Sequence, residues 1–344
     1  MAPTVQTRKD EHKEETVTYD VNLPYKPADG VAHKRTDFPE YLPSWDDQTF
    51  HEDPAAFEYL DPATRAAADM PNLFSSDIVT TDITPRLGTI VEGINLKGLS
   101  DAAKDELALL ITKRKVVVLR DQSDFLAAGP KYQQDLMAYF GVPNVQPVTG
   151  SVKGYPGFHI IHRDNNQDEI EAHLRHKMTS TLWHQDVSYE RQPPGYIMLG
   201  ILACPDVGGD TVFADTTEAY RMMIEHVRSV EGIVRRNPVE SIHPIVRVHP
   251  VTGEKSIWVN AEFVTGIAGF KKTESDLLLK FLVEHVVMGH DFQARVMWEK
   301  DSVVLFDGRN TLHTATVDYD SRIQARHIFR LASMTEKPIA VKQD

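Results

Sequence analysis

The stretch Trp183-His184-Gln185-Asp186, together with the distant His313, is the most informative part of this chain. In an extended strand, alternate side chains point to the same face, so His184 and Asp186 can reach one metal ion while Gln185 points away. Two imidazoles and one carboxylate form the 2-His-1-carboxylate facial triad, which holds a non-heme Fe(II) and leaves the opposite face open. The sequence therefore predicts an iron site made by His184, Asp186 and His313.

His184 and Asp186 also allow interpretations without a metal ion. His184 could be an ordinary surface or core histidine and Asp186 a turn former. A second tripeptide of the same form, His162-Arg163-Asp164, is followed at once by three polar residues, so we interpret it as a loop. A hydrolytic zinc site can use similar ligands, but the chain lacks the His-Glu-x-x-His helix of that class. Mixed nitrogen and oxygen ligation without thiolates favours iron.

The composition narrows the classes of protein that this chain can be. Its 344 residues suffice for one large domain or two small ones, and 41% of them are hydrophobic. A formal net charge of −13 argues against nucleic-acid binding through bulk electrostatics. The single cysteine, Cys204, excludes an intramolecular disulfide and a four-cysteine zinc site. A polar N-terminus and the lack of an apolar run of about 18 residues predict no secretory signal and no membrane span, hence a cytoplasmic protein.

The chain divides into three parts by composition. Residues 1–19 are rich in Lys, Glu, Asp and Thr and are expected to be a disordered tail. Residues 20–75 form an irregular extension rich in proline and aromatic residues, which we expect to pack against the domain or another subunit. Residues 76–344 are expected to form the catalytic domain.

The hydrophobic pattern of the third part predicts a mainly β domain with helices packed outside. The helices are expected over residues 101–112, 131–140, 217–227 and 274–287, the first with Ser100 as its N-cap. The strands are expected over residues 89–94, 116–119, 157–161, 196–202, 210–213, 256–259, 302–306 and 327–332.

From about Ile83 to Leu331 the chain resembles the taurine/sulfonate dioxygenase family, a branch of the Fe(II)- and 2-oxoglutarate-dependent dioxygenases. It is most similar to the fungal sulfonate dioxygenase-like members. The resemblance rests on an ordered set of motifs: Thr84-Pro85, Val117-Val118-Leu119-Arg120-Asp121-Gln122, Phe140-Gly141, Trp183-His184-Gln185-Asp186-Val187, Pro193-Pro194, Gly208-Gly209-Asp210-Thr211, His249-Pro250-Val251-Thr252-Gly253, Val259-Asn260, His313 and Arg326-His327-Ile328-Phe329-Arg330.

The resemblance implies a double-stranded β-helix, the cupin-like jelly roll, with helices buttressing one face. It implies a reaction in which O2 and 2-oxoglutarate are consumed together. The decarboxylation of 2-oxoglutarate, which gives succinate, is coupled to the oxidation of a second substrate. The cosubstrate would chelate the iron through its 2-oxo acid end. Its far carboxylate would pair with Arg326 and accept a hydrogen bond from Thr211. An arginine fork suits a buried carboxylate, and Arg322 is a rival for the same role.

The resemblance also implies which residues contact the primary substrate. Arg330, four residues after Arg326, would bind an anionic group unless it pairs with an acidic residue, and Trp258 would line the substrate site unless it is ordinary core. Taurine enzymes use a histidine before the iron strand and an asparagine just upstream of the His-x-Asp pair. Neither has a clear match at residues 147–151 or 179–182. Another alkyl sulfonate, or a small carboxylate such as an amino acid, therefore stays open as substrate.

Three other functions remain at this point. The first is an amino-acid oxidising enzyme of natural-product biosynthesis, acting by hydroxylation, desaturation or ring closure on the same fold. The second is a non-catalytic protein that binds small acids, which would have no need of an open iron face. The third is a metallohydrolase of cupin-like architecture, which would work without oxygen. A homo-oligomer is one option by analogy with the family, whose members often form dimers or tetramers, and the sequence does not decide the oligomeric state.

Overall fold

The computed structural model describes residues 36–45, 49–74, 77–147, 149–164, 166–167, 171, 174, 182–217, 223–227, 236 and 239–341. The tail predicted at 1–19 and the first part of the predicted extension lie outside these residues. No helix in the described part of the chain is both long enough and apolar enough to cross a membrane.

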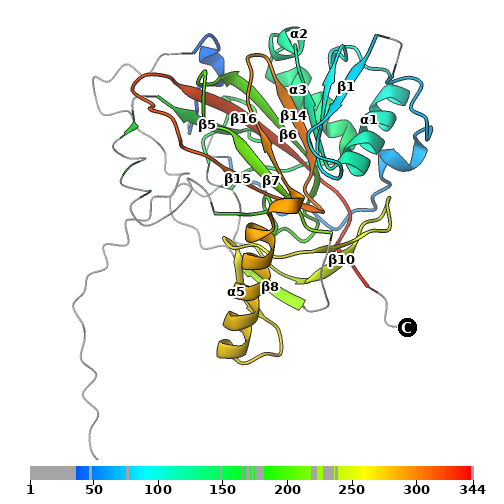
Figure 1. The fold of residues 1–344 in the computed structure, drawn as a ribbon, viewed down its shortest axis with the longest axis vertical. Helices are drawn as coiled ribbons and strands as arrows, with labels where there is room; N and C mark the ends of the chain where they lie inside the picture. Colours follow the sequence, from blue (N-terminus) through cyan, green and yellow to red (C-terminus); the bar gives the residue numbers. More distant parts are fainter. Residues whose placement is uncertain are drawn as a thin grey trace, which may run out of the picture.

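The largest sheet has eight strands, in the order β1-β2-β3-β14-β6-β16-β4, with β5 paired to β16 as well. Its long strands β16, β6 and β14 lie side by side across the molecule (Figure 1). The strands are β1 (Val79–Asp82), β2 (Thr89–Glu92), β3 (Val116–Leu119), β4 (Val142–Pro143), β5 (His159–Arg163), β6 (Pro194–Ala203), β14 (Val303–Asp307) and β16 (Arg326–Met334).

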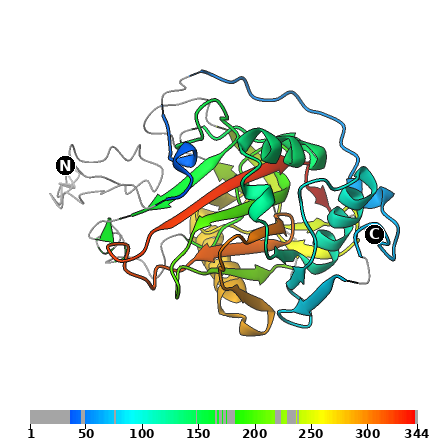
Figure 2. The ribbon, with the colours of Figure 1, turned by 90° about the horizontal axis from the view of Figure 1, so that it is seen from above.

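Helices cover one face of this sheet. They are α1 (Asp101–Arg114), the short α2 (Ser123–Leu126) and α3 (Pro130–Phe140), which lie together on one side of the molecule (Figure 2). Ser100 caps α1 because its hydroxyl accepts a hydrogen bond from the backbone N–H of Ala103. Apolar residues of α1 and α3, such as Leu107 and Phe140, share a core cluster with Leu305 and Leu331 of the sheet. The helices thus pack against β14 and β16 on the face of the large sheet that they cover.

A second sheet packs on the opposite face and completes the jelly roll. It consists of β13 (Gln293–Val296), β7 (Thr211–Asp215) and β15 (Thr311–Ala315), in that order. Its Phe213 meets Phe306 of β14 with ring centroids 5.1 Å apart. Both rings belong to an apolar cluster between the two sheets, and the His313 ring of β15 lies beside them.

Smaller sheets and helices lie outside the two main sheets. Two three-stranded sheets are formed by β8 (Met223–Val227), β9 (Glu240–Pro244) and β12 (Val264–Ile267), and by β10 (Val246–Val248), β11 (Lys255–Ile257) and β17 (Ile339–Ala340). Helix α5 (Lys272–Met288) buries Leu282 and Val286 in a cluster with Ala214 and Leu312. The 3-10 helices are η1 (Pro39–Tyr41), η2 (Pro62–Arg65) and η3 (His290–Phe292).

Two sequence interpretations are corrected by the structure. The helix expected over 217–227 is wrong at Met223–Val227, which form strand β8, and residues 218–222 lie outside the described part. His162-Arg163-Asp164 was interpreted as loop, but His162 and Arg163 belong to β5. The polar residues after Asp164 suggested a loop, whereas pairing with β16 keeps this segment extended.

The described part of the extension packs against the domain. The Tyr41 ring is fully buried and stacks on Phe329 of β16 at 5.6 Å. Its hydroxyl donates to Gln133 of α3 at 2.8 Å, and the Tyr59 hydroxyl donates to the carbonyl of Phe140 at 2.8 Å. The aromatic residues of this segment thus contribute to the domain's own core, while the boundary predicted at residue 76 stays a prediction.

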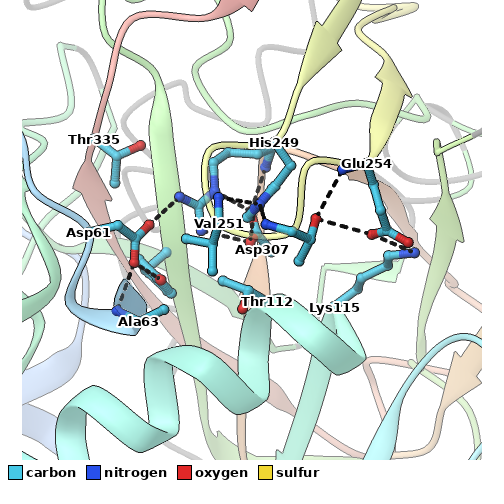
Figure 3. Close-up of polar contacts among 12 residues, drawn as sticks. Asp61, Ala63, Thr112, Lys115, His249, Val251, Glu254, Asp307 and Thr335 are labelled. Carbon is cyan, nitrogen blue, oxygen red and sulfur yellow. Dashed lines mark hydrogen bonds and ion pairs between the residues drawn. The ribbon is translucent and has the colours of Figure 1, made fainter. Parts of the chain in front are cut away.

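A buried charge network ties the extension to the turn before β15 (Figure 3). Arg309 and Asp307 are both fully buried, and the guanidinium donates to the Asp307 carboxylate from Nε at 2.8 Å and Nη2 at 2.7 Å. Nη1 of Arg309 donates to Asp61 of the extension at 2.5 Å. Arg309 lies four positions before His313, so this network fixes the start of the strand that carries a predicted iron ligand.

His249 completes the network and explains the His-Pro-Val-Thr-Gly motif. Its Nδ1 accepts hydrogen bonds from the backbone N–H groups of Val251 and Thr252, both at 3.2 Å. Its Nε2 therefore carries the proton and donates to Asp307 at 2.9 Å. Burial and the charge of Arg309 lower the pKa of His249, which keeps the ring neutral.

The buried His327 should make the stability of the fold sensitive to acid. Its Nε2 lies 3.0 Å from the Tyr41 carbonyl oxygen. Burial and the neighbouring His162 lower its pKa to about 3 from the usual 6.5. Between these values the unfolded chain binds a proton that the folded chain does not, so the free energy of unfolding falls as the pH falls. His327→Gln should reduce this slope in denaturant titrations by about 1.4 kcal/mol per pH unit. An unchanged slope would show that folded His327 is already protonated.

Candidate metal centre

Strand pairing brings His184 next to His313, although 129 positions separate them in the sequence (313 − 184). The two residues form an isolated antiparallel bridge. The His184 N–H donates to the His313 carbonyl at 3.1 Å, and the His313 N–H donates to the His184 carbonyl at 2.9 Å. Their ring centroids are 4.3 Å apart. The backbone bridge thus holds the two residues that carry these imidazoles side by side.

Asp186 enters from a turn rather than from the expected extended strand. Only His184 makes a bridge, and residues 186–189 form a turn in which Val187 adopts a positive φ of 41°. A β-branched residue is strained there, which is typical of functional sites. Asn260 holds this turn, since its side-chain amide donates to the carbonyl of Gln185 and to the Ser188 hydroxyl, both at 2.9 Å.

The three side chains converge as a possible metal site. One ligand atom from each of His184, Asp186 and His313 lies within 4.8 Å of the others, and all three residues are buried. Nε2 of His184 is 3.7 Å from Oδ1 of Asp186, and Nε2 of His313 is 3.9 Å from Oδ2 of the same carboxylate. These separations exceed hydrogen-bond length and leave room for an ion between the atoms.

The donor set fits Fe(II). Nδ1 of His184 lies 2.7 Å from the carbonyl oxygen of Leu182, so that nitrogen carries a proton and Nε2 keeps its lone pair. Oδ2 of Asp186 is buried without a hydrogen-bond partner among the described residues. A buried carboxylate oxygen without a donor is costly, and a cation would satisfy it.

Electrostatics keep two of the three groups ready to bind a cation. Burial raises the pKa of Asp186, but the positive charge of Arg330, the neighbouring His313 and the contact with His184 outweigh it, so the pKa is far below its usual range. Burial and the neighbouring His184 lower the pKa of His313 to about 3. Burial also lowers the pKa of His184, but Asp186 and Glu262 outweigh that effect and raise it.

Arg330 lies at the same centre. It sits on β16 and its Nη1 contacts Oδ1 of Asp186. Its side chain is 9% exposed, and its Nε has no partner in the described structure. Arg330 thus lies beside the predicted metal ligands and pairs with an acidic residue, as its alternative interpretation predicts, and its role in substrate binding stays a prediction.

Arg326 lies beside Gly209, two residues before Thr211, and on the same side of β16 as Arg330 because the two arginines are four residues apart. Its Nε donates to the carbonyl of Gly209 at 2.8 Å. A Cβ on Gly209, whose φ is +69°, would approach Cδ of Arg326 to 3.2 Å. The glycine therefore permits both the turn and the close arginine. Thr211 follows at the start of β7, and its hydroxyl accepts from Nε1 of Trp298 at 3.2 Å.

Arg326 differs from the other buried arginines of the described chain in lacking a carboxylate partner. Arg120, Arg236, Arg247, Arg309 and Arg330 each contact an Asp or a Glu. The nearby Asp210 is occupied by Arg295 at 2.5 Å. Burial lowers the pKa of Arg326 to about 10, a value at which the guanidinium still carries its charge at neutral pH. Such a buried cation is suited to bind an anion from outside the chain.

The structure separates the remaining candidates. Arg322, the rival of Arg326, is half exposed and pairs with Asp320 at 2.8 Å. Trp258 is fully buried with the Arg247 guanidinium 4.7 Å from its ring centroid, as its core alternative predicts. A role for Trp258 in the substrate site stays a prediction.

Sequence reasoning missed several residues of this centre. Asn260 belonged to the quoted Val259-Asn260 motif, yet nothing in the motif indicated that its amide holds the turn of Asp186. Glu262, whose Oε2 is 3.8 Å from Nδ1 of His184, carried no local signal. The same holds for Trp298, whose contact with Thr211 depends on the pairing of β13 with β7.

Comparisons with known proteins agree with this site. The model of the taurine catabolism dioxygenase TauD, TfdA family matches residues 80–332. An alpha-ketoglutarate-dependent sulfonate dioxygenase of Saccharomyces cerevisiae is 39% identical over 330 residues, covering 89% of this chain and 80% of that protein. The alpha-ketoglutarate-dependent dioxygenase cnsP of Penicillium expansum is 34% identical, covering 89% and 88%. Alpha-ketoglutarate is another name for 2-oxoglutarate.

A solved structure shows the same fold. The crystal structure of a putative alpha-ketoglutarate-dependent taurine dioxygenase from Burkholderia xenovorans superposes with a TM-score of 0.62 and 25% identity, covering 78% of this chain and 99% of that one. The jelly roll expected from the sequence is thereby confirmed. The chain belongs to the taurine catabolism dioxygenase TauD, TfdA family and is an Fe(II)- and 2-oxoglutarate-dependent dioxygenase.

Proposed function

We propose that this dioxygenase oxidises a small alkyl sulfonate at the carbon beside sulfur, with His184, Asp186 and His313 as its iron ligands. The observation that carries the metal assignment is the convergence of three buried ligand atoms within 4.8 Å. Bound Fe(II) would supply the activation of O2 that couples decarboxylation of 2-oxoglutarate to substrate oxidation.

The chain's own residues would position both small molecules. Arg326, with no carboxylate partner in the described structure, would pair with the far carboxylate of 2-oxoglutarate, and the Thr211 hydroxyl would donate to it. Arg330 would turn its guanidinium from Asp186 toward the anionic group of the substrate. The apolar interior behind Phe213 and Phe306 would exclude water from the reacting carbon.

The sulfonate class is supported by the yeast relative, whose name states that activity. Oxidation of R–CH2–SO3⁻ at the carbon beside sulfur consumes one O2 and one 2-oxoglutarate and gives succinate and CO2. The resulting 1-hydroxysulfonate breaks its C–S bond, the hydroxyl proton leaves, and an aldehyde and sulfite are released. Sulfite release is therefore the product that distinguishes this substrate class.

The Penicillium relative supports a second candidate, oxidation of a small amino or carboxylic acid in natural-product biosynthesis. Its name states 2-oxoglutarate dependence without a sulfonate. The proposed contacts of Arg330 would suit a carboxylate as well as a sulfonate, since both are anions.

The test is succinate and sulfite formation, in air with Fe(II), across a panel of alkyl sulfonates, sulfate esters and amino acids. A sulfonate that stimulates succinate and releases equimolar sulfite would support the main proposal. Stimulation by amino acids alone would favour the second candidate. No stimulation by any member would contradict both.

Arg330→Ala should weaken use of the substrate far more than binding of 2-oxoglutarate. We expect kcat/KM for the best substrate to fall by about 10²-fold, because a charge-assisted contact made in the transition state is lost. The dissociation constant of 2-oxoglutarate should change by less than about threefold. Equal weakening of both would indicate that Arg330 mainly supports the Asp186 ligand.

A further inference from the structure

On one face of the sheet, the strand β5 has the same alternation of basic and apolar residues as its neighbour β16. In the antiparallel register Arg163 lies opposite Arg326, Ile161 opposite Ile328, and His159 opposite Arg330. Directly paired residues of two antiparallel strands have their side chains on the same face. The face of β16 that carries both proposed anion-binding arginines is therefore continued by two basic side chains of β5.

The pairing of Arg163 with Arg326 is unfavourable without an anion. Like charges directly opposite each other in a sheet repel. Burial lowers the pKa of Arg163, and the charge of Arg163 contributes to the lowered pKa of Arg326. Neither guanidinium has a carboxylate within ion-pair distance among the described residues, unlike the exposed Arg322 with its Asp320. A carboxylate placed between the two would relieve both the repulsion and the desolvation.

Tyr319 adds a third donor near this end. It is 9% exposed, and its hydroxyl has no hydrogen-bond partner in the described structure. Its ring and Cδ of Arg326 both lie 3.2 Å from the position of a Cβ on Gly209, so the two side chains flank the same glycine. A buried phenol without a partner beside two guanidiniums is typical of a site that receives an oxygen-rich ligand.

His159 lies at the other end of the same face. It is half-buried, and its Cα pairs with that of Arg330, which contacts the proposed ligand Asp186. Its imidazole can donate an N–H to an anion held by Arg330. A sulfonate offers three oxygens and a carboxylate two, so a second donor next to the arginine favours the three-oxygen group.

We propose that β5 supplies a second basic side chain to each anion-binding end of the active site. Arg163 would join Arg326 on the far carboxylate of 2-oxoglutarate, and His159 would join Arg330 on the sulfonate of the primary substrate. This inference rests on the proposed function. It adds His159 from a strand expected over residues 157–161 and Arg163 from a segment that the sequence had indicated as a loop.

Calorimetric titration of the full-length, Mn(II)-loaded protein without oxygen tests both halves, because it measures binding apart from turnover. Arg163→Met should raise the dissociation constant of 2-oxoglutarate by about tenfold or more, the loss expected for one charge-assisted contact. It should leave that of 1-hexanesulfonate, measured with 2-oxoglutarate present at saturation, nearly unchanged. His159→Leu should show the reverse pattern, with about fivefold weaker hexanesulfonate binding.

Conservative variants and a remote arginine separate binding from folding. Arg163→Lys and His159→Gln keep a donor and should each recover part of the lost affinity. Arg322→Met removes an exposed, paired arginine and should change neither constant. Thermal unfolding of each variant checks that the fold is retained.

Each outcome decides the assignment. Affinities within twofold of the wild type, or equal weakening of both ligands by both variants, would overturn the role of β5 while leaving the proposed function intact. Hexanesulfonate that fails to bind the wild type would overturn the His159 half together with the sulfonate proposal. Failure of the wild type to bind 2-oxoglutarate would overturn the Arg163 half and the proposed cosubstrate site.

Discussion

Replacing His184 with alanine is expected to lower the rate of succinate formation by about 10³-fold or more, equivalent to about 4 kcal/mol. The variant loses one of three ligand atoms that lie within 4.8 Å of each other, and two ligands hold a divalent ion poorly. Initial rates with the best substrate and saturating 2-oxoglutarate measure the effect. Metal content after dialysis should fall in parallel.

A matched control is His290→Ala, which removes an exposed histidine of η3. It should keep both the rate and the metal content of the wild type. Circular dichroism should show the same fold for both variants, since His184 keeps its backbone pairing with His313 after truncation. Near-normal activity of the His184 variant with an intact fold would refute the metal assignment.

Replacing Arg309 with methionine is expected to lower the free energy of unfolding by about 3–5 kcal/mol, the range for breaking a buried ion pair by removing one partner. Arg309 and Asp307 are fully buried and in contact, and Asp61 is 4% exposed. Removing the guanidinium would therefore leave two buried carboxylates without their cation. Urea titrations followed by tryptophan fluorescence measure this loss.

The exposed pair of Lys131 and Asp135 provides the contrast. Its side chains are 75% and 59% exposed, and Lys131→Met should leave the unfolding midpoint nearly unchanged, because solvent screens such pairs. Adding Asp61→Asn to the Arg309 variant should restore part of the lost stability, since one stranded charge is removed. If Arg309→Met were as mild as Lys131→Met, the network would be solvated in solution.

Local patterns in the sequence predicted the regular elements well. The N-cap at Ser100 and the strand at Val116–Leu119 were correct because cap chemistry and a short apolar run are local signals. The error at Met223–Val227 arose where pairing with β9 and β12 decides the conformation and local preference does not.

The candidate site was predictable in its residues but not in its geometry. Residue types and order pointed to His184, Asp186 and His313, yet the bridge joining the two histidines depends on contacts between distant segments. The turn that presents Asp186 was missed because Asn260, 74 positions later in the chain (260 − 186), holds it. The opposition of Arg163 and Arg326 likewise depends on a strand register that no local pattern encodes.

The buried ion pair of Asp61 and Arg309 limits where a shortened form of this protein can begin. The family match begins at residue 80, so a shortened chain designed on similarity alone would discard Asp61 along with the Tyr41 and Tyr59 contacts. Arg309 would then keep Asp307 and the more distant Glu336, at 3.5 Å, but would lose the short contact with Asp61. The matched family segment is thus shorter than the part of the chain that these contacts join, and we expect a minimal active fragment to start upstream of Thr36, whose hydroxyl lies 2.9 Å from Nδ1 of His327.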